Sequence, residues 1–261
     1  MKIKQYQVDA FAERPFTGNP AAVCLLEQWP EDALLQAIAE ENNLSETAFL
    51  VPFADGFHLR WFTPATEVPL CGHATLAAAH VVFQHLNFSG REVVFHTLSG
   101  VLLVVRQDGR LLMNFPVSRP EICLNPPAAL SEALGCQPSE VWAADDYLVL
   151  LSNEDDIKKL TPDFAALKTL DLRGVIVTAA GRDCDFVSRF FGPKVGINED
   201  PVTGSAHCQL APFWADSLGR EHLIGKQISR RGGTIECQLL GERVLLAGSA
   251  VTVISGEIDC L

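Results

Sequence analysis

The feature that most constrains the fold of this chain is an internal repeat. The segment Arg60-Trp-Phe-Thr-Pro64 recurs as Arg189-Phe-Phe-Gly-Pro193, and Glu67-Val-Pro-Leu-Cys-Gly-His-Ala74 recurs as Glu199-Asp-Pro-Val-Thr-Gly-Ser-Ala206. Both copies follow the pattern Arg-aromatic-Phe-x-Pro and then Glu-x-Pro-x-x-Gly-x-Ala, and the second copy has three extra residues between Arg and Glu. The glycines of the two copies lie 132 residues apart, about half the chain. Two motifs in the same order at this separation indicate a duplicated half-chain.

Each copy predicts the same local structure. Alternating apolar and polar residues at 57–62 and at 185–191 predict a strand, which a proline-containing turn follows. A helix is then expected to begin near Gly72 in the first copy and near Gly204 in the second. The first helix is apolar nearly all round, so we expect it to be enclosed on every side. The second helix is expected to end at Gly219.

The rest of each half is rich in strand signals, with further helices expected at 30–42 and 127–134. We therefore predict an α+β fold with two pseudo-symmetric halves, each a curved, mostly antiparallel sheet wrapped around a central buried helix. The halves are placed at 1–117 and 118–261, and the last strand of the chain could instead belong to the first half.

Composition argues against several kinds of partner. The formal net charge is −12, whereas nucleic acids and anionic membranes both require a basic protein surface. A hydrophobic content of 48% with 20% charged residues is typical of a globular chain. The longest aliphatic run, 101–105, is far shorter than the roughly 18 residues of a membrane span. No nucleic-acid or membrane partner is expected.

The eight cysteines do not follow a metal-binding pattern. None are spaced as Cys-x-x-Cys, so no structural metal site is expected. Most lie in apolar stretches, which predicts free, buried thiols. The first residues of the chain predict a strand rather than an export signal, so the expected location is the reducing cytoplasm.

The two predicted helix starts, Gly72-His73 and Gly204-Ser205, are candidate binding elements. A helix start has unpaired backbone N–H groups and the positive end of the helix dipole. If the duplicated halves face each other across a cleft, both starts can bind one substrate carboxylate. The alternative is that the glycines only allow close packing of helix and sheet.

Glu46 is the most unusual acidic residue, because it lies between a polar turn and a run of core-strand residues. Burial of its carboxylate predicts a raised pKa, which suits a group that takes and returns a proton. The alternative is that Glu46 caps backbone amides or pairs with an arginine. The sequence leaves these two interpretations equal.

Nearly the whole chain resembles the PhzF-like isomerases of phenazine biosynthesis, which share the diaminopimelate epimerase fold. The resemblance depends on several segments together, namely 9–23 (DAFAERPFTGNPAAV), 44–48 (LSETA), 62–75 (FTPATEVPLCGHAT), 199–206 (EDPVTGSA) and 230–233 (RRGG). It implies a hydrogen shift on a small carboxylic acid that requires no metal and no organic cofactor.

The resemblance also implies roles for individual residues. Glu46 matches the acid/base glutamate of the family, and His73 and Asp200 match two polar catalytic residues that face it. The expected substrate-binding residues are Ser45, Gly72, Gly204 and Ser205. For His73 the alternative is a local bond at a helix start, and for Asp200 it is a helix cap.

Two other functions remain as alternatives to a cofactor-independent isomerase. In the epimerases of this fold, two cysteines act on opposite faces of the substrate, and Cys71 lies where one of them would be. The repeat places Thr203 at the second position, so a thiol-dependent racemase or epimerase is disfavoured. The third function is a non-catalytic module that binds small molecules. The expected partner is a small carboxylate substrate, and a homodimer is left open.

Overall fold

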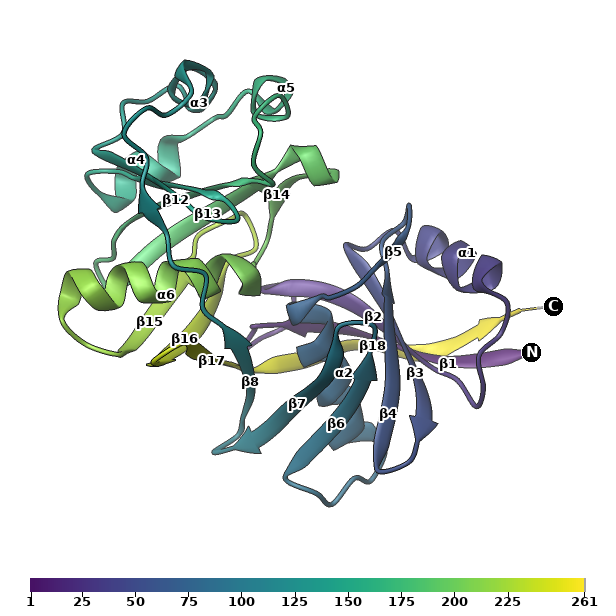
Figure 1. Ribbon diagram of the computed structural model, residues 1–261. Coiled ribbons are helices and arrows are strands. Elements are labelled where there is room, and N and C mark those ends of the chain that lie inside the picture. The colour runs from purple at the N-terminus through teal and green to yellow at the C-terminus, as the bar shows by residue number, and fades with distance from the viewer. Residues whose placement is uncertain (261) are drawn as a thin grey trace. The chain divides into compact units, whose positions relative to one another are not determined.

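The computed structural model describes residues 1–260, which form two compact units (Figure 1). The first unit comprises Met1–Asn114 and the C-terminal segment from Ala247, and the second comprises Phe115–Leu246. The division therefore lies just before the expected boundary at 117/118. The C-terminal segment belongs to the first unit because its strand pairs with the N-terminal strand over nearly the whole length of both.

The first unit contains a mixed sheet and two long helices. Its strands are β1 (Lys2–Ala10), β2 (Asn19–Leu25), β3 (Glu46–Phe53), β4 (Gly56–Phe62), β5 (Glu67–Val68), β6 (Glu92–Thr97), β7 (Gly100–Gln107), β8 (Arg110–Pro116) and β18 (Ala250–Asp259), and its helices are α1 (Asp32–Asn42) and α2 (Gly72–His85). Strands β18, β1, β2, β3, β4, β6, β7 and β8 are neighbours in this order.

The second unit has the same kind of sheet, one long helix and several short ones. Its strands are β9 (Glu121–Ile122), β10 (Glu140–Ala143), β11 (Tyr147–Leu150), β12 (Val175–Ala180), β13 (Phe186–Gly192), β14 (Ile197–Asp200), β15 (His222–Gln227), β16 (Gly233–Leu240) and β17 (Arg243–Gly248). Its helices are α3 (Ala128–Leu134), α4 (Glu154–Lys159), α5 (Phe164–Leu167), the 3₁₀ turn η1 (Pro193–Val195) and α6 (Gly204–Leu218).

The two sheets repeat one pattern of strand pairing. In the first unit, β1–β2, β3–β4 and β6–β7 are antiparallel, whereas β2–β3 and β4–β6 are parallel. In the second unit, β10–β11, β12–β13 and β15–β16 are antiparallel, whereas β11–β12 and β13–β15 are parallel. This correspondence confirms the predicted α+β fold with pseudo-symmetric halves. Each sheet is mostly antiparallel with two parallel pairs.

Helix α2 is the central buried helix of the first unit. It packs against β1, β2, β3 and β18, and ten of its residues are buried. Small side chains such as Ala77, Ala78 and Ala79 allow the strands to approach its backbone closely. The expectation of an enclosed helix is therefore confirmed.

Helix α6 is the counterpart in the second unit, where it packs against β15 and β16. Pro212 lies inside this helix and has no N–H to donate to Cys208 O, one turn earlier. The backbone N–H of Ser118 donates to this carbonyl instead, at 3.0 Å. The helix ends at Gly219, whose φ of 66° is a left-handed conformation that glycine adopts without strain.

The repeated arginine and glutamate form the same bidentate ion pair in each unit. Arg60 donates from Nε and Nη2 to the two carboxylate oxygens of Glu67, both at 2.7 Å. Arg189 donates in the same way to Glu199, at 2.7 and 2.9 Å. Each pair joins a long strand, β4 or β13, to the short strand that leads towards α2 or α6. The pair thereby fixes where the helix begins.

No helix within residues 1–260 combines the length and the apolar character needed to cross a membrane.

We expect the Arg189–Glu199 pair to contribute strongly to stability. Arg189 is 12% exposed at its side chain, and it also donates to the carbonyls of Ile157 and Leu160 at 3.0 Å. The Arg189→Met variant leaves the half-buried Glu199 carboxylate without its cation, so it should lose about 3 kcal/mol of unfolding free energy. Urea denaturation of the variant and the parent protein measures this loss.

The matched control is Lys2→Met, which removes the exposed pair between Lys2 and Glu257. Exposed ion pairs contribute little, so this change should stay within about 0.5 kcal/mol. Equal losses in the two variants would contradict the structural role of the Arg189–Glu199 pair.

Candidate active site

Glu46 occupies the first position of β3, where its backbone is paired with Ala21 of β2. The preceding turn begins at Asn43, which ends α1 in the left-handed conformation with φ of 47°. This turn sends the chain from α1 into the sheet, and only 8% of the surface of Glu46 is exposed. The turn before Glu46 and the paired strand β3 after it thus position the carboxylate in the protein interior.

His73, the second residue of α2, faces Glu46. Its Nε2 lies 3.1 Å from Glu46 Oε2, within ion-pair distance, although the two atoms do not form a well-aligned hydrogen bond. Its Nδ1 lies 3.2 Å from Asn19 Nδ2 and 3.5 Å from Cys71 Sγ. The structure therefore brings two of the three predicted catalytic residues together. The partner of Glu46 is this histidine rather than an arginine.

The pKa of Glu46 is lowered, so the expectation of a raised pKa is wrong. Burial by itself raises the pKa of this carboxyl, but the charge of His73 and polar contacts with His73 and Cys71 outweigh burial. Burial likewise lowers the pKa of His73, but Cys71 and Glu46 raise it well above its usual value. Both shifts are those of an ion pair, in which each group favours the charged form of the other. The sequence did not show which cation would lie beside Glu46.

Cys71 immediately precedes α2 and is buried. Burial and the charge of Glu46 raise the pKa of its thiol to about 11, so the thiol is protonated at neutral pH. Its backbone carbonyl accepts a hydrogen bond from Thr75 Oγ1 at 2.6 Å. In the second unit, His207 Nδ1 lies 2.8 Å from the carbonyl of Thr203, which is the counterpart of Cys71. In both units, the backbone carbonyl of the residue before the helix is therefore bonded to a side chain four residues later.

Asp200, the third predicted catalytic residue, is the last residue of β14 and is 6% exposed. Its carboxylate accepts a hydrogen bond from Thr203 Oγ1. Gln227 Nε2 donates to the backbone carbonyl of Asp200 at 2.7 Å and to Thr203 Oγ1 at 3.1 Å. Thr203 occupies the N-cap position of α6, and its side chain makes no capping hydrogen bond, so the role of Asp200 stays a prediction.

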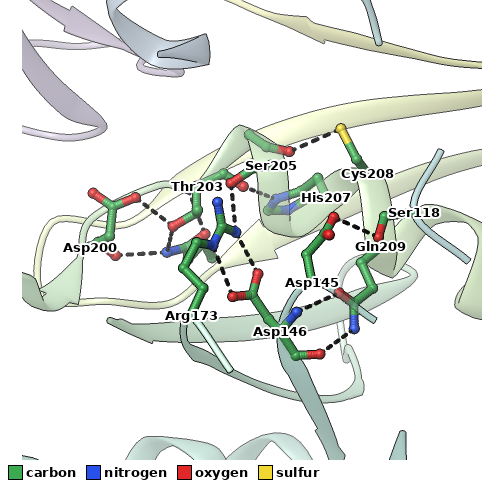
Figure 2. A network of polar contacts seen from close by, with 12 residues as sticks. Ser118, Asp145, Asp146, Arg173, Asp200, Thr203, Ser205, His207, Cys208 and Gln209 are labelled. Atoms are coloured by element: carbon green, nitrogen blue, oxygen red, sulfur yellow. Dashed lines mark hydrogen bonds and ion pairs between the residues drawn. The ribbon is translucent and has the colours of Figure 1, made fainter. Parts of the chain in front are cut away.

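Ser205 lies in the first turn of α6 and accepts a hydrogen bond from Arg173 Nη2 at 3.1 Å (Figure 2). Arg173 also donates to both carboxylate oxygens of Asp146, which is almost fully buried. The backbone N–H and C=O of Asp146 are both bonded to the side-chain amide of Gln209, within α6. Because a guanidinium only donates, Ser205 keeps its own hydroxyl proton for another acceptor.

Arg173 is a residue that the sequence analysis missed. Strand register shows its relation to Glu46, because Thr47 pairs with Phe62 in the first unit and Val175 pairs with Phe191 in the second. Phe62 and Phe191 are matching repeat residues, so Gly174 takes the position of Glu46. Arg173 is one residue earlier and reaches Ser205, the counterpart of His73. In the first unit, the strand start and the helix start bring Glu46 and His73 together. In the second unit, the corresponding positions bring Arg173 and Ser205 together.

The remaining predicted site residues lie beside these groups. Gly72 and Gly204 are the first residues of α2 and α6, and Ser45 is in the half-buried turn directly before Glu46. That the two helix starts share one carboxylate stays a prediction. Among the described residues, one group of side chains could hold a metal ion: Glu46, Cys71 and His73.

Comparisons of the sequence and of the structure with known proteins agree on one family. The model of the phenazine biosynthesis-like (PhzC–PhzF) proteins matches residues 8–256. An uncharacterized isomerase of Pseudomonas aeruginosa is 54% identical over 258 residues, which cover 99% of each chain. The crystal structure of a PhzF family protein of Enterococcus faecalis is 46% identical, with a TM-score of 0.97 and full coverage of both chains.

A more distant structure shows the same fold. The hydroxyproline epimerase of Agrobacterium vitis is 12% identical and has a TM-score of 0.63, covering 98% of this chain and 91% of its own. The family model and the two more similar proteins extend over nearly the whole chain. The chain therefore belongs to the phenazine biosynthesis-like (PhzF) family, and it is an isomerase.

Proposed function

We propose that this isomerase moves a proton on a small carboxylate-bearing metabolite without a cofactor, and that Glu46 is its acid/base. The observation that carries the proposal is the buried Glu46–His73 pair. A carboxylate with a lowered pKa is present in its basic form throughout the neutral range. Its histidine partner, whose pKa is raised by Glu46 and Cys71, is held by the start of α2.

The proposed reaction consists of two proton transfers. Glu46 takes a proton from one carbon of the substrate, and the electron pair of the broken C–H bond delocalises into the conjugated carboxylate. Glu46 then returns the proton to a different carbon of the same conjugated system. Atoms and electrons balance without an oxidant or a reductant. The imidazolium of His73 lowers the energy of the anionic intermediate through its charge.

We propose that the polar residues at the start of α6 contact the substrate. Ser205 suits a substrate carboxylate because Arg173 occupies its acceptor side and leaves its hydroxyl proton to donate. Asp200 is fixed through its carboxylate and its backbone carbonyl, so it can orient a hydroxyl or ammonium group of the substrate. Gly72, Gly204 and Ser45 complete the proposed set of binding residues.

The thiol-dependent alternative receives little support. Two-base epimerisation requires a thiolate on one face of the substrate and a thiol on the other. The raised pKa of Cys71 keeps it protonated, and its counterpart Thr203 has no thiol. The hydroxyl of Thr203 is also committed to Asp200. All eight cysteines are free, which supports a proposed location in the reducing cytoplasm.

The proposal predicts that Glu46→Gln abolishes the exchange of substrate hydrogen with solvent. Glutamine keeps the shape of the side chain but cannot carry the proton, so exchange should fall at least about 100-fold. NMR spectroscopy in heavy water, applied to a panel of cyclic dienol acids and amino acids, first identifies a substrate and then measures the rate.

The matched control is Glu41→Gln, which changes an exposed glutamate near the end of α1. This variant should exchange at the parental rate. Parental exchange in Glu46→Gln would exclude Glu46 from the reaction.

The electrostatic coupling of the pair predicts a second outcome. The His73→Asn variant removes the cation that lowers the pKa of Glu46 and retains the burial that raises it. The pKa of Glu46 should therefore rise from below to above its ordinary value of 4.5. Carbon-detected NMR titration of the Glu46 carboxyl group measures this shift without a substrate.

Asp171 serves as an internal control in the same titration. Its pKa is lowered by a hydrogen bond from Tyr147, in the other unit, and should not change. In the active enzyme, the acidic limb of the pH–rate profile should move to higher pH together with Glu46. An unchanged Glu46 pKa in His73→Asn would show that the histidine does not control this carboxylate.

A further inference from the structure

Three side chains of metal-binding type meet at the start of α2. Glu46, Cys71 and His73 each supply one donor atom, and these atoms all lie within 4.8 Å of one another. Each residue is at least nine-tenths buried. Such a cluster differs from the exposed acidic groups that are common on protein surfaces, because burial limits the water that competes for the ion.

The spacing of two of these atoms already suits a tetrahedral zinc ion. With Zn–S near 2.3 Å and Zn–N near 2.0 Å, a thiolate and an imidazole on one zinc lie about 3.5 Å apart. Cys71 Sγ and His73 Nδ1 are 3.5 Å apart. Occupation by zinc would replace the contact between Nδ1 and the amide of Asn19. The carboxylate of Glu46 is the group that must move, and it lies on a flexible side chain.

The cluster also contains two buried polar atoms that contact each other without an aligned hydrogen bond. Glu46 Oε2 and His73 Nε2 are buried and make no aligned hydrogen bond among the described residues, despite lying 3.1 Å apart. Buried polar atoms in this state are unusual and cost free energy. A ligating histidine commonly donates its other N–H to a carboxylate. Glu46 cannot fill that role while it binds an ion on Nδ1, because the two ring nitrogens point to opposite sides of the ring, so its carboxylate leaves Nε2 when it binds the ion.

Charge and donor type select the ion. A thiolate and a carboxylate together carry two negative charges, so a divalent cation makes the buried group neutral, which lowers the cost of burial. Magnesium and calcium bind oxygen donors, whereas zinc accepts mixed sulfur, nitrogen and oxygen donors. Three protein ligands leave the fourth position of zinc for water or a substrate.

We infer that Glu46, Cys71 and His73 form a reversible Zn²⁺ site, and that zinc bound there inhibits the isomerase. Binding releases the thiol proton of Cys71 and the Nδ1 proton of the His73 imidazolium to the solvent, and the metal–sulfur and metal–nitrogen bonds replace the S–H and N–H bonds. Inhibition follows because the ion occupies the carboxylate that transfers the proton. This second part rests on the proposed function, whereas zinc binding does not.

Cobalt titration of the metal-free protein tests the binding. Co²⁺ replaces zinc in tetrahedral sites and reports a thiolate ligand through a near-ultraviolet charge-transfer band. One equivalent per chain should produce this band, and added Zn²⁺ should abolish it. A cobalt spectrum without the thiolate band, or no binding in large metal excess, would overturn the inference.

Cysteine variants assign the site. Cys71→Ala should lose the band and weaken zinc binding by about 100-fold or more, since loss of outer partners alone costs up to that factor. Cys208→Ala, which removes a buried thiol of α6, should behave as the parent protein. Cys71→Ser preserves the size of the side chain and provides a second test if the alanine variant does not fold. Unchanged affinity in both Cys71 variants would exclude this cluster.

The exchange assay separates this inference from the proposed function. Zinc should inhibit the parent enzyme and Cys208→Ala at concentrations that do not slow Cys71→Ala, where each rate is compared with that of the same variant without zinc. Equal zinc sensitivity in Cys71→Ala would overturn the inhibitory role. If no substrate exchanges in the parent enzyme, the proposed function fails while the cobalt titration still decides the metal site.

Discussion

The bidentate arginine–glutamate pair in each unit is the interaction on which the rest of the structure depends. The planar guanidinium matches the two oxygens of a carboxylate, so Arg60–Glu67 and Arg189–Glu199 fix both distance and orientation. Each arginine also lies over the aromatic ring two residues later, Phe62 or Phe191, at about 5 Å. The position of the strand therefore determines the position of the following helix. The positions of the side chains at the start of α2 and α6 are fixed in the same way.

Within this shared frame, the two units have diverged to opposite chemistry. The first unit places the anionic Glu46 at the beginning of a strand and the cationic His73 at the helix start. The second unit places Arg173 just before the corresponding strand and the neutral Ser205 at the helix start, with Asp146 compensating the arginine. The first arrangement is a buried carboxylate whose pKa is lowered by its histidine partner. The second provides an oriented hydroxyl donor.

The Glu46–His73 pair shows why burial alone does not predict protonation. A lone carboxylate in this position would have a raised pKa, because desolvation penalises its charge. A neighbouring imidazolium reverses the direction, since the two opposite charges form a group with no net charge. The same buried position also makes the cluster with Cys71 suitable for a soft divalent cation.

The repeat, the local periodicity and the turn residues were enough to determine the duplicated α+β fold and its enclosed helix, because these signals are encoded within short segments. They also placed Glu46 at a strand end and His73 and Ser205 at helix starts, whereas Asp200 was singled out only through the family resemblance. The two parallel strand pairs in each sheet, the lowered pKa of Glu46 and the role of Arg173 became apparent only in the tertiary structure. Arg173 and Ser205 are 32 residues apart in the chain, and no local signal records their contact. Charge partners of this kind are selected by three-dimensional packing, because the energy of a buried ion depends on which groups surround it and not on its neighbours in sequence.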